Sequence, residues 1–234
     1  MASEKSKGVS RRKMIQGTAA AAAAAMMSQP AAAAVRRPRP VAPSVKTYAN
    51  ADFYDAKGTF LPEKAKAAYF EMMERFSYPI PDGLRKGIWV LDFALKDFIH
   101  CGMGGIFWWN SEKYRYFGHE IFLLPGQMIV EHAHVETPKG PAKMEAWQPR
   151  HGMIYTFGEG DETKPLPVKL TEMQDKYRTV KHCEPLMPGE IRELNRLTAK
   201  HFMYAGPEGA IVTEYATFHD GDGLRFSNPD VKLS

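Results

Sequence analysis

Short runs of aromatic and β-branched residues, separated by turn residues, fill most of the chain from residue 88 onward. Pro-Gly pairs or Gly-rich segments at 125–126, 188–189 and 206–209 separate several of these runs. The runs are 88–93, 105–109, 116–124, 128–134, 144–147, 153–157, 179–184, 201–204 and 210–217. Closely spaced short strands with turn signals are typical of a sandwich or barrel. The sequence therefore predicts an all-β domain.

A single amphipathic helix is predicted ahead of these strands, over residues 62–76. Its apolar residues follow the i, i+3, i+4 spacing of one helix face, and they are Ala65, Ala68, Tyr69, Met72 and Phe76. Pro62 is acceptable in the first turn of a helix. We expect this short N-terminal helix to pack on the outside of the β domain.

The first 34 residues carry the whole net charge of +4, because they contain five basic residues and one acidic residue. The remaining 200 residues are formally neutral. A duplex-binding protein presents a basic footprint on its folded domain. A nucleic-acid partner is therefore not expected.

The N-terminal sequence has the order of a bacterial export signal. Paired arginines, Arg11 and Arg12, precede an apolar stretch at 19–27 and small residues at 31–34. The arginine pair indicates the twin-arginine class, so the partner would be the twin-arginine export machinery. The apolar stretch is too short for a permanent membrane span. A disordered Ala-rich tail is the alternative.

These features divide the chain into a signal peptide (1–34), a Pro-rich flexible linker (35–56) and one β domain (57–234). The predicted location is the periplasm. Cys101 and Cys183 do not form a C-x-x-C pair, which excludes a cysteine zinc knuckle, and we expect both to be buried as small apolar residues. No Gly-rich phosphate loop follows a strand.

His132 and His134 are two residues apart in a predicted strand, so their imidazoles lie on the same face. Two such side chains can bind one metal ion. Paired histidines on strands are also common as ordinary polar residues, so this spacing alone leaves metal binding open. Glu131 should face the other way and is not expected to be a ligand.

The sequence around these histidines resembles the first signature of the cupin superfamily. Gly126 precedes His132 by five intervening residues, and Glu145 precedes Gly152 by six. The spacing from His134 to Glu145 is eleven residues, which is longer than usual in cupins.

This long spacing, followed by Lys143, Glu145, Trp147, Arg150 and Gly152, resembles the D-lyxose ketol-isomerase family. Further similar stretches lie at 92–97, 188–190, 200–201 and 205–214, so the resemblance covers roughly residues 57–234. It implies a cupin-type double-stranded β-barrel (jelly roll) and a homodimer.

The resemblance also implies one divalent metal ion held by His132, His134, Glu145 and His201. Three imidazoles and a carboxylate suit a first-row ion, with Mn²⁺ the first choice and Fe²⁺, Co²⁺ or Zn²⁺ as alternatives. The second cupin signature, around His201, is degraded in this sequence. His182 is the substitute ligand if His201 points elsewhere.

The activity implied by the resemblance is an aldose–ketose isomerisation, D-lyxose to D-xylulose and also D-mannose to D-fructose. Glu214 would be the proton-transferring base, with a pKa raised by a dry pocket, and Lys143 the cation beside the developing oxyanion. Trp147 and Arg150 would position sugar hydroxyls. A metal-dependent dioxygenase and a non-catalytic periplasmic sugar-binding protein are the alternatives.

The remaining histidines receive structural interpretations. His100 and His119 are expected to be structural or surface residues, and His219 is expected to be exposed. The pair Trp108-Trp109 resembles a sugar-stacking platform, but adjacent aromatic residues on a strand usually place at least one ring in the core.

Overall fold

The computed structural model describes residues 44–233, and the predicted signal peptide lies outside this range. The packed part of the chain begins before the predicted boundary at residue 57. Phe53, at the end of the 3-10 helix η2 (Asn50–Phe53), is only 1% exposed. The last residues of the predicted linker are therefore part of the folded domain, because this aromatic ring is buried in its core.

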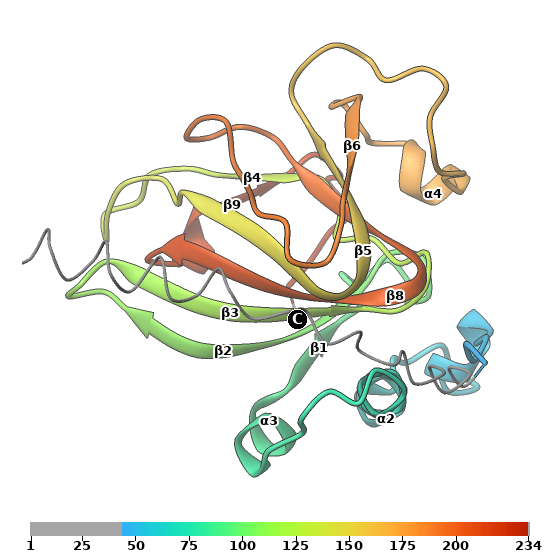
Figure 1. The fold of residues 1–234 in the computed structure, drawn as a ribbon. Helices are drawn as coiled ribbons and strands as arrows, with labels where there is room; N and C mark the ends of the chain where they lie inside the picture. The colour runs from blue at the N-terminus through green and yellow to red at the C-terminus, as the bar shows by residue number, and fades with distance from the viewer. Residues whose placement is uncertain (1–43, 234) are drawn as a thin grey trace, which may run out of the picture. The chain divides into compact units, whose positions relative to one another are not determined.

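One antiparallel sheet forms most of the domain, with strand order β1-β2-β3-β8-β5-β6 and with β7 also paired to β5 (Figure 1). The strands are β1 (Trp89–Leu91), β2 (Met103–Ser111), β3 (Tyr116–Leu123), β5 (Glu145–Gly158), β6 (His182–Leu186), β7 (Arg192–Glu193) and β8 (Phe202–Thr217). The prediction of an all-β domain is confirmed.

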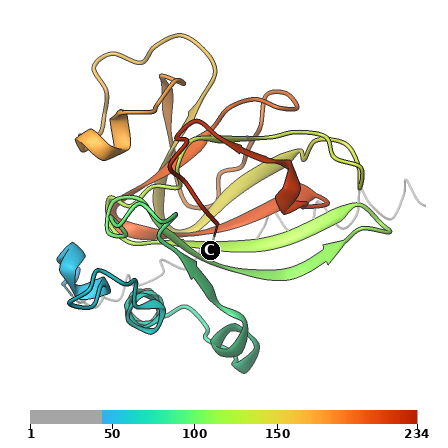
Figure 2. The same ribbon diagram turned by 180° about the vertical axis from the view of Figure 1, so that it is seen from behind.

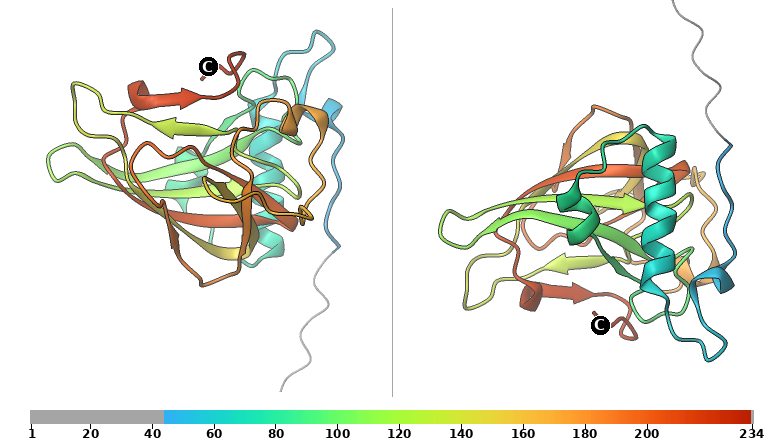
Figure 3. Two further views of the ribbon diagram at one scale, coloured as in Figure 1. Left: turned by 90° about the horizontal axis from the view of Figure 1, so that it is seen from above. Right: turned by 90° about the horizontal axis from the view of Figure 1, so that it is seen from below.

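A second, two-stranded sheet pairs β4 (His132–His134) with β9 (Leu224–Phe226). The left view of Figure 3 shows β9 beside β4 and across from the larger sheet. His132 also forms backbone hydrogen bonds with His201, just before β8. The space between the two layers therefore has a histidine-bearing strand on one side and the large sheet on the other.

Two pairs of predicted strands are in fact continuous. The runs 144–147 and 153–157 are both parts of β5, and the runs 201–204 and 210–217 lie along β8. The predicted turn at 206–209 is wrong, because these residues form an irregularity inside β8 where the register with β5 shifts. Gly209 has a φ of +76° there, a conformation that glycine adopts at little cost.

The predicted N-terminal helix is confirmed as α2 (Pro62–Arg75). Tyr69 and Met72 are buried in a core that includes Ile106, Phe122 and Ile211 from the large sheet. Figures 1 and 2 show α2 and α3 (Asp82–Gly87) on the same side of that sheet, and the right view of Figure 3 shows α2 crossing it. The two other short helices are α4 (Glu172–Asp175) and η3 (Gly221–Gly223).

The two cysteines are buried, as predicted, and they do not form a disulfide with each other. The expectation for the tryptophan pair is wrong, since Trp108 is 44% and Trp109 59% exposed. A register shift between Phe107 and Trp109 accounts for this, because it places consecutive side chains outside the core. None of the helices within 44–233 has the length and apolar character of a membrane span.

Candidate metal centre

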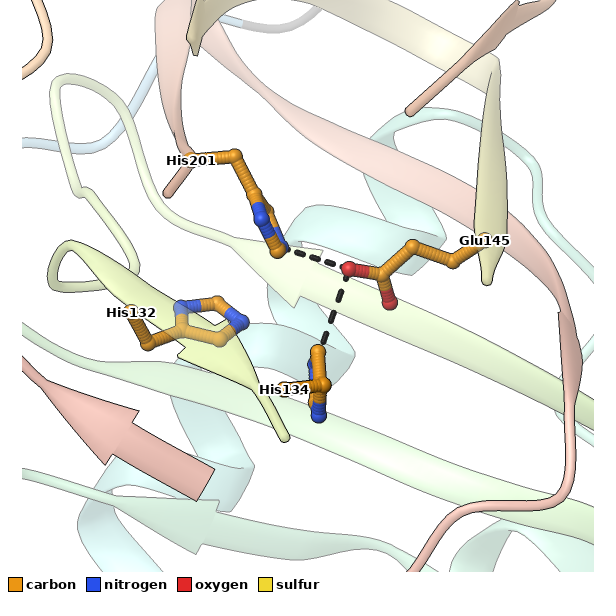
Figure 4. Close-up of side chains that lie close together, drawn as sticks. All are labelled: His132, His134, Glu145 and His201. Carbon is orange, nitrogen blue, oxygen red and sulfur yellow. Dashed lines mark ion pairs between the residues drawn. The ribbon is translucent and has the colours of Figure 1, made fainter. Parts of the chain in front are cut away.

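Four side chains from separate parts of the chain meet between the two sheets: His132, His134, Glu145 and His201. Their potential ligand atoms all lie within 4.8 Å of one another, and Figure 4 shows the side chains pointing toward a common centre. The two histidines of β4 share a face, and Glu145 is the first residue of β5. His134, Glu145 and His201 are each 3% exposed.

The backbone orients two of the imidazoles. Nδ1 of His132 lies 2.9 Å from the carbonyl oxygen of Val130, and Nδ1 of His201 lies 2.9 Å from that of Ala199. A carbonyl oxygen only accepts, so Nδ1 is the donor in each ring and Nε2 faces the centre. This is the arrangement that orients metal-binding histidines in proteins.

The donor atoms of the centre fit a cation. Nε2 of His134 is buried without a hydrogen-bond partner, and its nearest acidic neighbour is Oε1 of Glu145 at 3.6 Å. Burial lowers the pKa of His132 to about 3 and also lowers the pKa of His134, so both rings are neutral. A neutral imidazole is the form that binds a metal ion.

Glu145 is ionised despite its burial. Burial alone would raise the pKa of this carboxyl, but the nearby Lys143 ammonium and His201 outweigh burial and hold the pKa well below its usual range. Burial would likewise lower the pKa of His201, but Glu145, 2.5 Å from its Nε2, raises that pKa. A divalent cation bound by both residues would replace the proton between them, because metal ligands bind in their deprotonated form.

A buried ion pair between Lys143 and Glu214 adjoins these four residues. Nζ of Lys143 lies 2.7 Å from Oε2 of Glu145 and also contacts Glu214, and both Lys143 and Glu214 are buried. The expectation of a raised pKa for Glu214 is wrong. Burial acts in that direction, but the Lys143 charge outweighs it and lowers the pKa of Glu214.

Cross-strand pairing explains why these side chains meet. On the inner face of the large sheet, His119 of β3 lies opposite Glu214 of β8, and Glu214 lies opposite Trp147 of β5. Directly paired residues project to the same face of a sheet. Nδ1 of His119 is 3.3 Å from Oε2 of Glu214, so this histidine donates to the carboxylate from the side away from Lys143.

A cavity of about 300 Å³ contains all of these groups. Its lining includes the four clustered residues together with Lys143, Trp147 and Glu214, so seven of the eight site residues predicted from the sequence face one space. Arg150 does not. It lies an odd number of residues beyond Trp147 on β5, and its exposed guanidinium binds Gln148 instead.

Neither His182 nor Glu131 belongs to the cluster. His182 is away from the cluster, half-exposed and bonded to the carbonyl oxygen of Asp161, so His201 is the third clustered histidine. Glu131 faces away from the cluster, as predicted, and accepts hydrogen bonds from the backbone of Thr179 and Val180.

Two histidines that were not expected at the site line the cavity. His119 was expected to be a structural or surface residue, and the expectation that His219 is exposed is wrong, because it is partly buried against the cavity. Nε2 of His119 and Nδ1 of His219 are buried without hydrogen-bond partners, and burial lowers the pKa of His219 to about 4. The alternation of Phe117, His119 and Ile121 along β3 is the signal that could have placed His119 on the inner face. His219 follows β8 and has no such periodic signal.

Several curated proteins are similar to this chain over most of its length. A D-lyxose/D-mannose isomerase from Thermosediminibacter oceani is 31% identical over 163 residues, which are 70% of this chain and 88% of the relative. A D-lyxose ketol-isomerase from Cohnella laeviribosi is 28% identical over 169 residues, 72% of this chain and 91% of the relative. No protein-family model matches the chain.

Solved structures support the fold. The structure of Cellulomonas parahominis L-ribose isomerase with L-ribose matches with a TM-score of 0.54 at 14% identity, over 71% of this chain and 90% of that protein. An L-ribose isomerase from Acinetobacter sp. DL28 matches with a TM-score of 0.51 at 14% identity, with the same coverage. The described domain is a cupin-type jelly roll, and the chain belongs to the D-lyxose ketol-isomerase family of sugar isomerases.

Proposed function

We propose that the protein is a metal-dependent aldose–ketose isomerase that interconverts D-lyxose with D-xylulose and also D-mannose with D-fructose. One observation carries this proposal: Lys143 lies between Glu145, a candidate metal ligand, and Glu214, inside one cavity. The names of the curated relatives support the same class of sugar substrate.

His132, His134, Glu145 and His201 would hold the metal, and their donor set suits Mn²⁺ or another divalent first-row ion. Such an ion would act as a Lewis acid that stabilises negative charge on the oxygens of C1 and C2. Trp147 lies against His201, with ring centroids 5.2 Å apart, and limits the space on that side of the cluster.

Glu214 is the proposed base. It is ionised at neutral pH, so it can accept the C2 proton of an open-chain aldose. The electron pair of the broken C–H bond then forms the C1=C2 bond of an enediolate, and the C1 carbonyl oxygen gains negative charge. Glu214 returns the proton to C1, while the O2 hydroxyl proton passes to O1.

Lys143 is the proposed electrophilic partner. Burial would lower the pKa of its ammonium, but Glu145 and Glu214 outweigh burial and raise that pKa, so the group keeps its proton. A fixed cation beside the developing oxyanion stabilises the transition state more than the ground state. Lys143 also fixes the position of the Glu214 carboxylate that it contacts.

A metal-dependent dioxygenase is a second candidate, and the cavity lining favours it in one respect. Aromatic and aliphatic side chains such as Phe107, Phe117 and Ile121 make up much of the wall. The buried Lys143 and Glu214 favour the isomerase instead, because an isomerase needs a base and a cation at the reacting carbons.

Two substitutions separate metal binding from proton transfer. Glu145→Ala should lose the metal, whereas Glu214→Gln should keep the metal and lose at least about 100-fold in kcat, the usual contribution of a general base. Metal content is measured by atomic emission, and turnover by sugar chromatography after incubation with D-lyxose and D-mannose. His182→Ala is the matched control, since this histidine lies outside the cluster, and it should keep both metal and turnover.

Full turnover in Glu214→Gln would reject the assigned base. Oxygen consumption by the metal-replete protein, with every aldose left unchanged, would favour the dioxygenase. Sugar binding without interconversion would favour a non-catalytic binding protein.

A further inference from the structure

The cavity has a polar end and an apolar end, and the strand register separates them. The polar row contains His119 and Glu214. Two residues further along β3 lies Ile121, in the row that continues through Gly105 of β2 to Trp89 of β1. The next row of β1 and β2 pairs Leu91 with Met103. The lining side chains therefore become apolar along the sheet in the direction from His119 toward Leu91 and Met103.

The opposite wall shows the same gradient. His132 and His201 are paired by backbone hydrogen bonds at the polar end. Further along the same two segments, Ile129 and Met203 are joined in the same way and line the cavity. Phe226, which pairs with His132, packs against Phe93 on the remaining side.

Within residues 44–233, no serine, threonine, tyrosine, asparagine, glutamine, aspartate or arginine side chain lines this cavity. These are the residue types that commonly satisfy buried hydroxyls. Apart from Nε2 of His134 and Oε1 of Glu145 in the candidate metal centre, the lining groups without hydrogen-bond partners are Nε1 of Trp89, Nε2 of His119 and Nδ1 of His219. The Trp89 ring stacks on His119, and the His119 and His219 rings both lie against Phe107, so these polar atoms gather near the polar row.

A substrate hydroxyl carried into the apolar end would lose water and find no protein partner there. Burying an unpaired hydroxyl is unfavourable. A methyl group at the same position would gain from contact with Leu91 and Met103. We propose that the preferred substrate is a 6-deoxyaldose, with its C1–C2 end at the polar row and its terminal methyl group in the apolar end. This inference rests on the proposed isomerase function.

The unmodified metal-replete protein tests the proposal with one matched pair of substrates, D-mannose and 6-deoxy-D-mannose. The two sugars differ only by the hydroxyl on C6. We expect kcat/KM to be about 10- to 100-fold higher for the 6-deoxy sugar, which is the range over which apolar pockets discriminate against one added hydroxyl. An equal or higher kcat/KM for D-mannose would overturn the proposal.

A variant provides a second, independent measurement. Met103→Gln places an amide in the apolar end with little change in volume. It should reduce the preference for the 6-deoxy sugar at least about threefold, because the amide can hydrogen-bond the C6 hydroxyl. Met187→Gln is the control, because Met187 is exposed and does not line the cavity, and it should leave the preference unchanged. An unchanged preference in a folded Met103→Gln protein would contradict the orientation. If this variant does not fold, the kcat/KM ratio of the unmodified protein for the two sugars still tests the proposal.

Failure of this inference is distinguishable from failure of the proposed function. Turnover of D-mannose or D-lyxose without a preference for the 6-deoxy sugar would reject only the apolar-end assignment. Absence of turnover with all three sugars, at full metal occupancy, would reject the isomerase function and this inference together.

Discussion

Lys143 keeps its charge inside the protein because two carboxylates contact it. An unpaired ammonium in this position would cost several kcal/mol in lost solvation. Glu145 and Glu214 remain ionised for the same reason, since each has the Lys143 ammonium beside it. The protonation states that the proposed reaction needs are therefore set by contacts within the cavity.

His119 is predicted to position Glu214. His119→Ala removes the Nδ1 donor that lies 3.3 Å from the carboxylate and should lower kcat about tenfold, with KM changed less than about twofold, in line with one charge-assisted hydrogen bond. The same donor lowers the pKa of Glu214. Its loss should therefore move the acidic limb of the kcat/KM profile to higher pH.

His119→Asn is the matched variant for this prediction, because its amide can donate from nearly the same place as Nδ1. It should recover most of kcat and restore the position of the acidic limb. Equal kinetics for the two variants would show that the Nδ1 hydrogen bond does not matter.

Part of the centre could be predicted from residue spacing alone. The alternation of a strand brings His132 and His134 together, but Glu145 and His201 are distant in the sequence, and only the family resemblance linked them. The pKa of Glu214 was predicted with the wrong sign because its direct contact with Lys143 is a tertiary feature. Arg150 was misplaced because the parity of its position on β5 was not applied.

At the scale of the elements, β5 and β8 are long strands that accommodate a mismatch in residue number. Gly152 of β5 has a φ of +65°, and a Cβ atom there would lie 1.9 Å from the carbonyl oxygen of Gly209 in β8. The two strands can approach at this register shift only because Gly152 has no side chain.

Gly152→Ala is expected to destabilise the domain by about 3 kcal/mol, the sum of left-handed backbone strain and a backbone clash. Urea unfolding followed by tryptophan fluorescence measures this change in the free energy of unfolding. Gly158→Ala, on the same strand, is the control. A Cβ atom at Gly158 meets no neighbour within 4 Å, so that variant should have native stability or slightly higher. Equal stability of the two variants would contradict the steric explanation.

The elements differed in how well the sequence predicted them. The helix over Pro62–Arg75 was recognised because its apolar period is carried by its own residues. The continuity of β8 was not recognised, because Gly206 and Pro207 are turn residues in isolation, whereas in the sheet they occupy a register shift opposite β5. The competition between local turn preference and pairing with a neighbouring strand is decided by tertiary structure.

At the scale of the whole molecule, a metal bound by residues of β4 and β5 and by His201, just before β8, would join both sheets. A ligand that binds only the folded state stabilises it by mass action. Metal binding should therefore contribute to stability as well as to activity.

Metal removal by EDTA is expected to lower Tm by about 10 °C, given ~4 kcal/mol for a ligand at about 1,000 times its Kd and a shift of about 2–4 °C per kcal/mol. Differential scanning calorimetry measures the shift, and adding back Mn²⁺ should reverse it. His134→Ala should abolish the dependence on EDTA, whereas His182→Ala should retain it. A Tm that does not respond to EDTA in the metal-loaded protein would contradict this role.

Two whole-molecule properties stay predictions from the sequence. Residues 1–34, on which the expected twin-arginine export to the periplasm depends, lie outside the described residues. The expected homodimer is an inference from the family resemblance.

The pairing of β4 with β9 has a consequence for the order in which the centre can form. Leu224–Phe226 of β9 pair with one edge of the strand that carries His132 and His134. The ribosome adds these residues about 90 positions after that strand, at ~5–20 residues per second. A nascent chain that has emerged as far as His201, the last of the four candidate ligands, still lacks this supporting strand. Selective capture of an ion by this candidate centre would therefore follow translation of the last strand, when both edges of β4 are in place.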